Sequence, residues 1–137
     1  MTISYNRLGS NGRLGNQMFQ YAALRGIADY HGYEWMVPVP NNYGTGNYGL
    51  FECFNMSSVS DKNFGIFSAQ TNVTTGQFHF SEGFYKKCPD NVNIHDYFQT
   101  EKYFKNIEAL IRSDYTFKDE IVDACKEVFD ELKKPIF

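Results

Sequence analysis

Hydrophobic and polar positions in the first third of the chain predict a strand followed by a helix. Residues 2–5 contain Thr, Ile and Tyr, which favour β-structure. Between residues 17 and 31 apolar side chains recur every three to four positions, which is the period of an amphipathic helix. That stripe is formed by Met18, Tyr21, Ala22, Leu24, Ile27 and Ala28. Asn16 is a residue type that caps helices and Gly32 is one that ends them, so we expect these two residues to bound the helix.

A second strand is predicted directly after this helix. Residues 33–37 read YEWMV, and the prolines at positions 38 and 40 that follow are poorly tolerated within a sheet. Between the first strand and the helix lies a loop with glycines at positions 9, 12 and 15. Strand, glycine loop, helix and strand together predict one βαβ unit with two parallel strands.

The middle of the chain has no clear period. Residues 41–49 are rich in Asn, Gly and Tyr and predict a loop. Residues 50–83 are irregular, with strand-like pieces at 64–67 and 77–80. Residues 91–94 predict a further short strand.

Two amphipathic helices are predicted in the last third. Thr100 is a candidate N-cap for a helix over residues 101–112, whose apolar side carries Tyr103, Phe104, Ile107, Leu110 and Ile111. Thr116 is a candidate N-cap for a helix over residues 117–133, which Pro135 would end. The apolar stripe of this second helix consists of Ile121, Val122, Cys125, Val128, Phe129 and Leu132.

Length and charge narrow the class of protein. A chain of 137 residues is the size of one domain, so we expect residues 1–137 to form a single α/β unit. Thirteen basic and sixteen acidic residues give a net charge of -3, which argues against a nucleic-acid partner. No apolar stretch approaches the roughly 18 residues of a membrane span, and the N-terminus has no apolar signal-peptide core. The expected location is therefore the cytoplasm.

Residue types that bind metals or act as nucleophiles are scattered. The sequence has no CxxC, and we expect its three cysteines to be free thiols that are mostly buried: Cys53, Cys88 and Cys125. No HxxxH, DxD or GxSxG motif occurs, and the histidines lie far apart at positions 31, 79 and 95. We expect no metal.

The loop before the first helix is the strongest candidate site. It reads GRLGNQ over residues 12–17. Glycines allow a ligand to approach the backbone closely, and a helix N-terminus with a nearby Arg favours an anion such as phosphate. The glycines at 9, 12 and 15 match neither a P-loop nor GxGxxG. On spacing alone, a tight turn with a solvated Arg13 is the alternative.

A second candidate segment, residues 95–104, mixes polar and aromatic side chains between a strand and a helix. Such mixtures suit carbohydrates, because aromatic faces meet C–H surfaces and polar groups meet hydroxyls. His95 and Asp96 are a poor catalytic pair, since neighbours on a strand point to opposite faces. The alternative is an aromatic core anchor followed by a capped helix.

These two segments resemble a known family. Residues 12–22, GRLGNQMFQYA, closely resemble the GGLGNQMFQYA motif of the α-1,2-fucosyltransferases, glycosyltransferase family 11. Arg13 is the one departure in that run, and it resembles the GRFGNQ version of the related protein O-fucosyltransferases. Residues 96–104, DYFQTEKYF, are similar to the family's GYFQSEKYF, with Asp96 in place of Gly. Residues 50–56 are similar to its L-x-x-F-x-L region, and the blocks follow the family's order.

The resemblance implies a fold and a reaction. It implies the Rossmann-like N-terminal half of a GT-B-type enzyme, with the active site between two such halves. It also implies an inverting transfer of fucose from GDP-fucose to a galactose 2-hydroxyl without a metal, which agrees with the absent DxD. Backbone amides near Gly15 and the Asn16 amide would hold the acceptor oxygen in line and neutralise the leaving GDP.

Site residues follow from the same resemblance. Asn16 is the catalytic candidate. The donor-binding candidates are Gly12, Arg13, Gly15, Asn16 and Gln17. The candidates on the acceptor side, or supporting it, are His95, Asp96, Tyr97 and Gln99.

One motif of the family, HxRRxD, does not occur in this sequence. In the family it supplies the Arg for the diphosphate and opens the second half, and Ile136-Phe137 look like the strand that would lead to it. We therefore expect a chain truncated before its GDP-binding half, with little or no transferase activity alone. The expected partners are a nucleotide sugar, a glycan acceptor, and either the missing half or a second copy of the chain. The alternatives are a non-enzymatic carbohydrate-binding or remnant α/β domain, and a structural domain whose glycine loop binds nothing.

Overall fold

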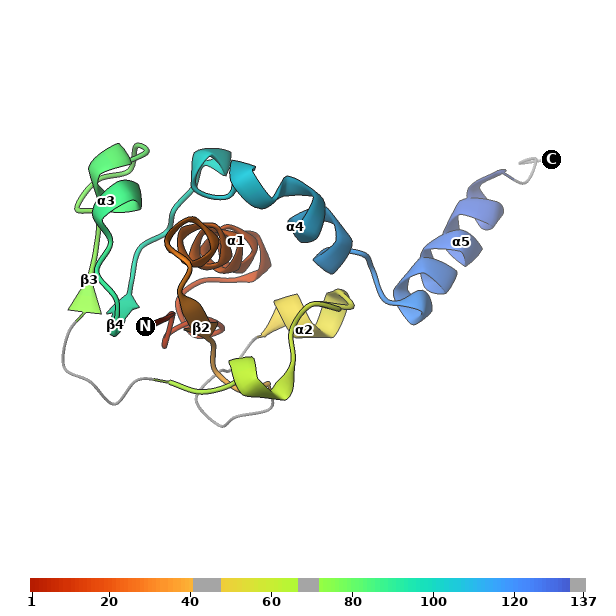
Figure 1. Cartoon of the computed structure of the whole chain (residues 1–137). Coiled ribbons are helices and arrows are strands. Elements are labelled where there is room, and N and C mark those ends of the chain that lie inside the picture. Colours follow the sequence, from red (N-terminus) through yellow and green to blue (C-terminus); the bar gives the residue numbers. More distant parts are fainter. Residues whose placement is uncertain (41–47, 67–71, 134–137) are drawn as a thin grey trace.

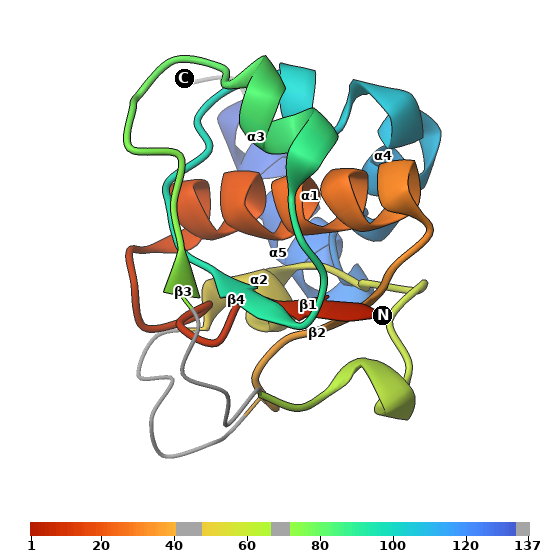
Figure 2. The same ribbon diagram turned by 60° about the vertical axis from the view of Figure 1, so that its left-hand side comes forward.

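Four parallel strands form the sheet of the computed structural model, which describes residues 1–40, 48–66 and 72–133. The strands are β1 (Thr2–Ser4), β2 (Glu34–Met36), β3 (Asn72–Val73) and β4 (Val92–Ile94). Their spatial order is β2-β1-β4-β3, and every pair is parallel (Figure 1, Figure 2). The predicted α/β class and parallel β1–β2 pair are confirmed, and the sheet is compatible with a Rossmann-like fold.

The strand register places apolar residues in one row across the sheet and polar residues in the next row. Ile3 lies level with Trp35 of β2 and with Val92 of β4, and all three side chains are buried. The next row brings Ser4 and the asparagines of β4 and β3 into register. In that row the amide of Asn93 donates to the side-chain oxygen of Asn72 at 2.7 Å. Asn6, in the loop after β1, completes the row: its side-chain oxygen accepts from the Ser4 hydroxyl and its amide donates to the Asn93 oxygen, both at 2.7 Å, so these buried polar groups are satisfied.

Helix α1 (Leu14–His31) lies across the apolar face of the sheet (Figure 2). Its apolar stripe is buried apart from the half-buried Met18, and the ring of Tyr21 meets that of Trp35 edge-on at 5.7 Å. The helix ends as predicted at Gly32, whose φ of 72° is left-handed. It begins earlier than predicted: Arg13 occupies the N-cap position, and Asn16 lies within the first turn. The expectation that Asn16 caps the helix is wrong, because the Arg13 carbonyl already accepts the amide of Gln17 at 2.9 Å.

The middle of the chain differs from the sequence-based expectation. Short helices α2 (Gly49–Cys53) and α3 (Glu82–Lys87) were not predicted, and neither was β3. Residues 77–79 form bends and residue 80 has no regular structure, and in 64–66 only Phe64 makes a bridge, with Val37. Position 67 and most of the predicted 41–49 loop lie outside the described residues.

The helix predicted over residues 101–112 is broken into three pieces. They are the 3-10 turns Glu101–Tyr103 and Lys105–Ile107, followed by α4 (Glu108–Asp114). Thr100 caps the first turn as predicted, accepting from the amide of Lys102. The break arises where this segment runs against α1: a Cβ atom at Gly26 would lie 1.9 Å from the carbonyl oxygen of Tyr103. Backbone contacts backbone there, and the chain bends to follow α1.

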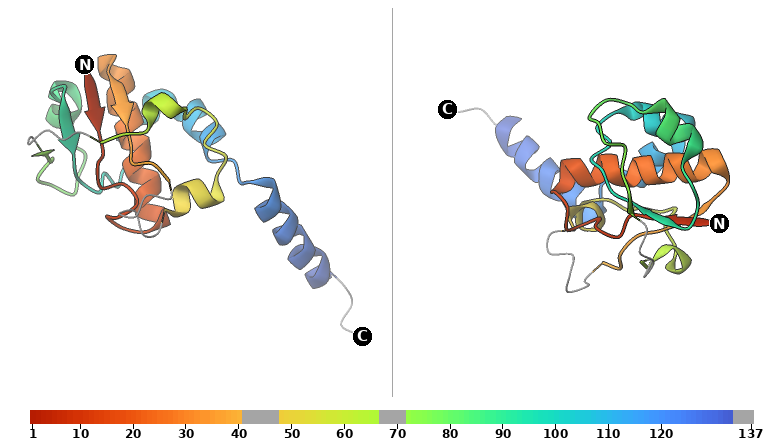
Figure 3. Two further views of the ribbon diagram at one scale, coloured as in Figure 1. Left: turned by 90° about the horizontal axis from the view of Figure 1, so that it is seen from below. Right: turned by 90° about the vertical axis from the view of Figure 1, so that its left-hand side faces the viewer.

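Helix α5 (Asp119–Lys133) begins later than predicted and leaves the body of the protein (Figure 1, Figure 3). Thr116 does not cap it, because the Thr116 hydroxyl donates to the carbonyl of Ser113 at 2.8 Å. None of its residues is buried, so its apolar stripe is not part of a core within the described chain. Pro135 and the strand expected at 136–137 lie outside the described residues.

The three cysteines differ in how deeply they are buried. Cys88 is buried, Cys53 is half-buried and Cys125 is exposed, so the expectation of mostly buried thiols holds for one of the three. No helix in residues 1–40, 48–66 and 72–133 has the length and apolar character needed to cross a membrane.

Candidate functional site

The two sequence segments singled out above meet at one edge of the sheet. Strands β1 and β4 are parallel neighbours, so the loops that follow them leave from the same edge. Residues 6–13 follow β1 and lead into α1, and residues 95–99 follow β4. In open α/β sheets, ligands bind outside the carboxyl ends of the strands.

The side chain of Tyr5 connects the two loops through hydrogen bonds. Its side chain is fully buried, and its hydroxyl donates to the carbonyl oxygen of Asp96 while accepting from the amide of Asp96 at 3.2 Å. The side-chain amide of Asn11, from the other loop, donates to the same hydroxyl at 3.4 Å. Burial raises the pKa of Tyr5 to about 12, so the hydroxyl stays protonated and the junction stays intact through neutral pH.

The glycine loop is shaped by Gly12. This residue has a φ of +108°, a conformation that glycine adopts without steric cost. A Cβ atom there would also lie 2.8 Å from the Cβ of Asn16. Gly15 is different: it lies in the first turn of α1, is exposed, and a Cβ atom there would meet nothing within 4 Å. The space outside Gly15 is open to a ligand.

Two buried glutamines of α1 hold this loop from behind. Gln17 donates from its side-chain amide to the carbonyl of Gly12 at 3.0 Å, and its oxygen accepts from the amide of Leu50 at 3.2 Å. Gln20 donates to the carbonyl of Asn11 at 2.8 Å. Both are fully buried, so Gln17 positions the loop and its side chain does not face solvent. The side-chain oxygen of Gln20 has no hydrogen-bond partner among the described residues.

Asn16 and Gln99 connect the two segments at the surface. The Gln99 amide donates to the side-chain oxygen of Asn16 at 2.8 Å. Phe98 makes this geometry possible, because its φ of +53° turns the chain while its ring is buried against Tyr5 and Tyr103. A positive φ is unfavourable for a bulky residue and persists only where packing imposes it.

Charges around the first turn of α1 favour an anion. The first turn contains no acidic residue, and Arg13 immediately before it is exposed. The Arg13 side chain makes no capping hydrogen bond. The first N–H groups of a helix have no acceptors within the helix, and with the helix dipole they attract negative charge.

The side chains of His95 and Asp96 have different main partners. The Asp96 carboxylate accepts from the amide and hydroxyl of Thr75, at 3.0 and 2.5 Å, and from the amide of Tyr97 at 2.8 Å. The imidazole of His95 instead meets the ring of Tyr5 edge-on at 6.3 Å. Burial, and then the positive charge of Arg7, lower the pKa of His95 below its usual 6.5, which keeps it neutral at pH 7. Asp96 supports the turn, and Tyr97 beside it is 41% exposed.

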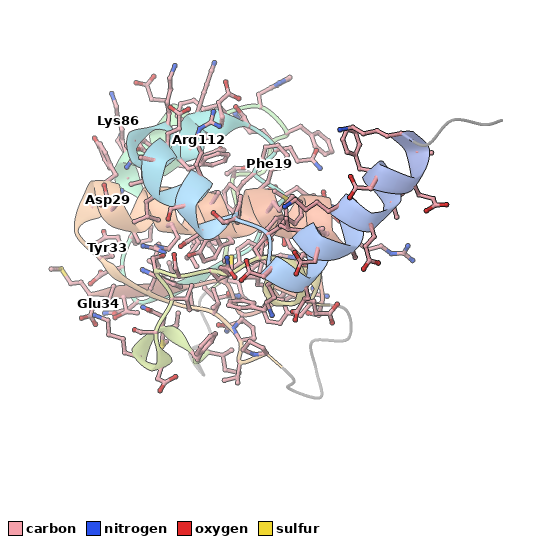
Figure 4. The ribbon with its side chains drawn as sticks, turned by 90° about the vertical axis from the view of Figure 1, so that its right-hand side faces the viewer. Phe19, Asp29, Tyr33, Glu34, Lys86 and Arg112 are labelled. Carbon is pink, nitrogen blue, oxygen red and sulfur yellow. The ribbon has the colours of Figure 1, made fainter. Side chains whose placement is uncertain are left out.

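A cavity lies elsewhere, along the edge strand β2. It has a volume of about 470 Å³ and is lined by Thr2, Arg25, Tyr33, Glu34, Trp35, Met36, Ser58, Lys62 and Asn63. Figure 4 labels Tyr33 and Glu34 among these residues. No cluster of three or more His, Cys, Asp or Glu residues suited to a metal occurs within the described ranges.

Comparisons with known proteins identify no relative of this chain. No family model, no curated protein and no solved structure matches the chain.

Tyr5 and Gln20 were not predicted as site residues from the sequence, whereas Phe98 belongs to the aromatic core anchor given as the alternative and is buried as that alternative expects. Tyr5 and Gln20 act through burial and through contacts with distant segments, which a sequence does not display. Gln20 did carry a signal, because it lies three positions after Gln17 and so shares its helix face.

Proposed function

We propose that the chain binds a nucleotide sugar of the GDP-fucose type at the edge formed by residues 12–16 and 97–99, as part of a fucosyltransferase. The observation that carries this proposal is the 2.8 Å hydrogen bond between Gln99 and Asn16. It brings together the two segments that resemble the fucosyltransferase motifs, although they lie 83 positions apart in the sequence.

The donor's diphosphate is the group that this edge suits best. Oriented N–H groups at the start of α1 and the guanidinium of Arg13 supply positive potential, and Gly12 and Gly15 leave the backbone accessible. A diphosphate carries its charge on several oxygens, so backbone amides and an Arg can share it.

Asn16 is proposed to contact the reacting end of the donor. Its oxygen accepts from Gln99, which leaves the amide nitrogen to donate to a sugar or phosphate oxygen. Gln17 acts as a positioning residue, since it holds the Gly12 carbonyl and is fully buried. Tyr97 and Gln99 are exposed, and we propose that they contact the acceptor glycan.

Binding is the readout rather than turnover, because we expect little or no transferase activity from a sequence without the HxRRxD motif. Isothermal titration calorimetry of the 137-residue chain with GDP and with GDP-fucose tests the proposal. We expect measurable binding that weakens in Asn16→Ala and in Arg13→Ala. A matched control is Arg112→Ala, which removes an exposed Arg from α4. No binding of either nucleotide would refute the proposal, and binding of fucosylated or galactose-containing glycans alone would favour a carbohydrate-binding module.

A further inference from the structure

The cavity along β2 has the size of a small-molecule site. Its volume of about 470 Å³ falls within the roughly 300–1,000 Å³ of ligand pockets. Residues of α1, β1, β2 and the 58–63 segment line it, and Figure 4 labels two of them, Tyr33 and Glu34. None of the lining residues belongs to segments 12–16 and 97–99, so this cavity is separate from the nucleotide site proposed above.

Arg25 leaves one edge of its guanidinium unused beside this cavity. Within the described residues its side chain makes every hydrogen bond through Nη1, which donates to the hydroxyls of Tyr21 and Ser58 at 2.6 and 2.7 Å. The same atom lies 3.5 Å from the carboxylate of Asp114. The side chain is only 12% exposed, and its guanidinium lies over the ring of Trp35. The remaining nitrogens, Nε and Nη2, carry two N–H groups that point in parallel from one side of the guanidinium.

Trp35 contributes further donors without a partner. The Glu34 amide and the Met36 carbonyl form hydrogen bonds on the β1 side, so the backbone groups of Trp35 between them face the outer edge of the sheet. On that edge its carbonyl accepts from the side-chain amide of Asn63 at 3.3 Å. Among the described residues neither its backbone N–H nor its indole N–H has an acceptor, although Trp35 is only 8% exposed. Such donors are usually satisfied.

The charges that line the cavity match a single negative charge. Arg25 and Lys62 are positive and Glu34 is negative, which leaves one positive charge in excess. Asp114 does not line the cavity, and its oxygens already accept hydrogen bonds from other side chains and a backbone amide. A monoanion therefore suits the cavity better than a diphosphate, whose additional charges would face Glu34 uncompensated.

We propose that this cavity binds a small monocarboxylic acid with an apolar body. The carboxylate lies on the Nε–Nη2 edge of Arg25, because its two coplanar oxygens match two parallel N–H groups. Lys62 and the N–H groups of Trp35 stabilise the same charge. The apolar body packs against Tyr33 and Met36, which line the cavity and are half-buried.

Trp35 is the single tryptophan of the sequence, so its fluorescence reports on the cavity directly. Titration of the 137-residue chain with hexanoate should change this fluorescence in a saturable manner. Hexanamide, which has the same shape and no charge, should not, and inorganic phosphate should bind more weakly than hexanoate. No saturable response to hexanoate, an equal response to hexanamide, or tighter binding of phosphate would overturn the proposal.

Two lysine variants test the charge without disturbing the core. Lys62→Glu reverses an exposed charge of the cavity and should weaken hexanoate binding about threefold. Lys126→Glu makes the same exchange at an exposed position of α5 and should leave the affinity unchanged. Equal effects of the two variants would count against the site.

Arg25→Lys tests the paired N–H groups. Lysine keeps a cation near Asp114 but cannot offer two parallel N–H groups, so hexanoate binding should weaken about tenfold. Circular dichroism shows whether the variant is folded, and the lysine pair above decides the matter where it is not. Unchanged affinity in folded Arg25→Lys would contradict the assignment.

NMR of the ¹⁵N-labelled chain observes the contact itself. The Nε–H resonance of Arg25, assigned by its loss in Arg25→Lys, should shift on addition of hexanoate, and a resonance that stays in place would exclude the contact. GDP-fucose should leave this resonance unchanged while it shifts those of residues 12–16. The two sites can thus fail independently of one another.

Discussion

The hydroxyl of Tyr21 donates a 2.6 Å hydrogen bond to the carboxylate of Asp114, joining α1 to the end of α4. Asp114 is fully buried and also accepts from the amide and hydroxyl of Ser58, at 2.9 and 2.6 Å. Arg25 lies 3.5 Å from the same carboxylate and stacks over the ring of Trp35 at 4.3 Å. The buried negative charge is therefore surrounded by donors and a cation.

Removing this carboxylate should be strongly destabilising. Asp114→Ala leaves Arg25 without its buried partner and is expected to cost about 3–5 kcal/mol of the free energy of unfolding. Tyr21→Phe removes one donor and should cost about 1–3 kcal/mol. Urea denaturation followed by circular dichroism measures both. Glu108→Ala, which removes an exposed partner of Arg112, is the control and should change stability by less than about 1 kcal/mol.

Gly26 should tolerate no side chain. A Cβ atom there would lie 1.9 Å from the carbonyl oxygen of Tyr103, so Gly26→Ala must push the 101–107 segment off α1. We expect a loss of about 3 kcal/mol. Gly15→Ala is the matched control in the same helix: nothing lies within 4 Å, and alanine's better helix propensity should stabilise by up to about 1 kcal/mol. Equal thermal midpoints for the two variants would contradict this contact.

Gly12→Ala should impair nucleotide binding more than it lowers the stability of the fold. Alanine is strained at a φ of +108°, and its Cβ atom would clash with the side chain of Asn16. The loop must therefore rearrange and carry Asn16 away from Gln99. Nucleotide binding should be lost, with destabilisation of roughly 1–3 kcal/mol from backbone strain. Calorimetry together with denaturation separates the two effects. Retained binding in this variant would show that the loop conformation is not required.

His95 should titrate below 6.5. Burial is the main cause of its lowered pKa and Arg7 the second. Because the folded pKa is lower than the unfolded one, the contribution of His95 to stability is present above pH 6.5 and is lost as the pH falls through the folded pKa. NMR titration of the imidazole proton should show Arg7→Ala raising the pKa part of the way toward 6.5. A pKa of His95 above 6.5 in the unsubstituted chain would contradict its partly buried position near Arg7.

Local patterns predicted the elements whose causes are local. The period of α1, the strands on either side of it, the strand before His95 and the cap at Thr100 depend on neighbouring residues, and the structure confirms them. Helix α3 also had a local signal, since Ser81 caps it by accepting from the amide of Phe84 at 3.2 Å. It was missed because its six residues carry no clear apolar period.

Features that depend on distant contacts were not predictable. Strand β3 has two residues and exists because Asn72 and Val73 pair with β4. The 101–112 segment has a helical period but is bent by its contact with Gly26. The periodicity predicted the apolar stripe of α5, but it could not predict whether another part of the chain packs against that stripe. At the site, the sequence marked Asn16 and Gln99, and only the fold brings them together.

The central claim is that a nucleotide sugar binds where Asn16 meets Gln99. Its most direct test is an NMR titration of the ¹⁵N-labelled chain with GDP-fucose, which follows every backbone amide. We predict that the resonances of residues 12–16 and 97–99 shift in a saturable manner, while those of the cavity around Arg25 and Glu34 do not. No saturable shifts, or shifts confined to that cavity, would contradict the account.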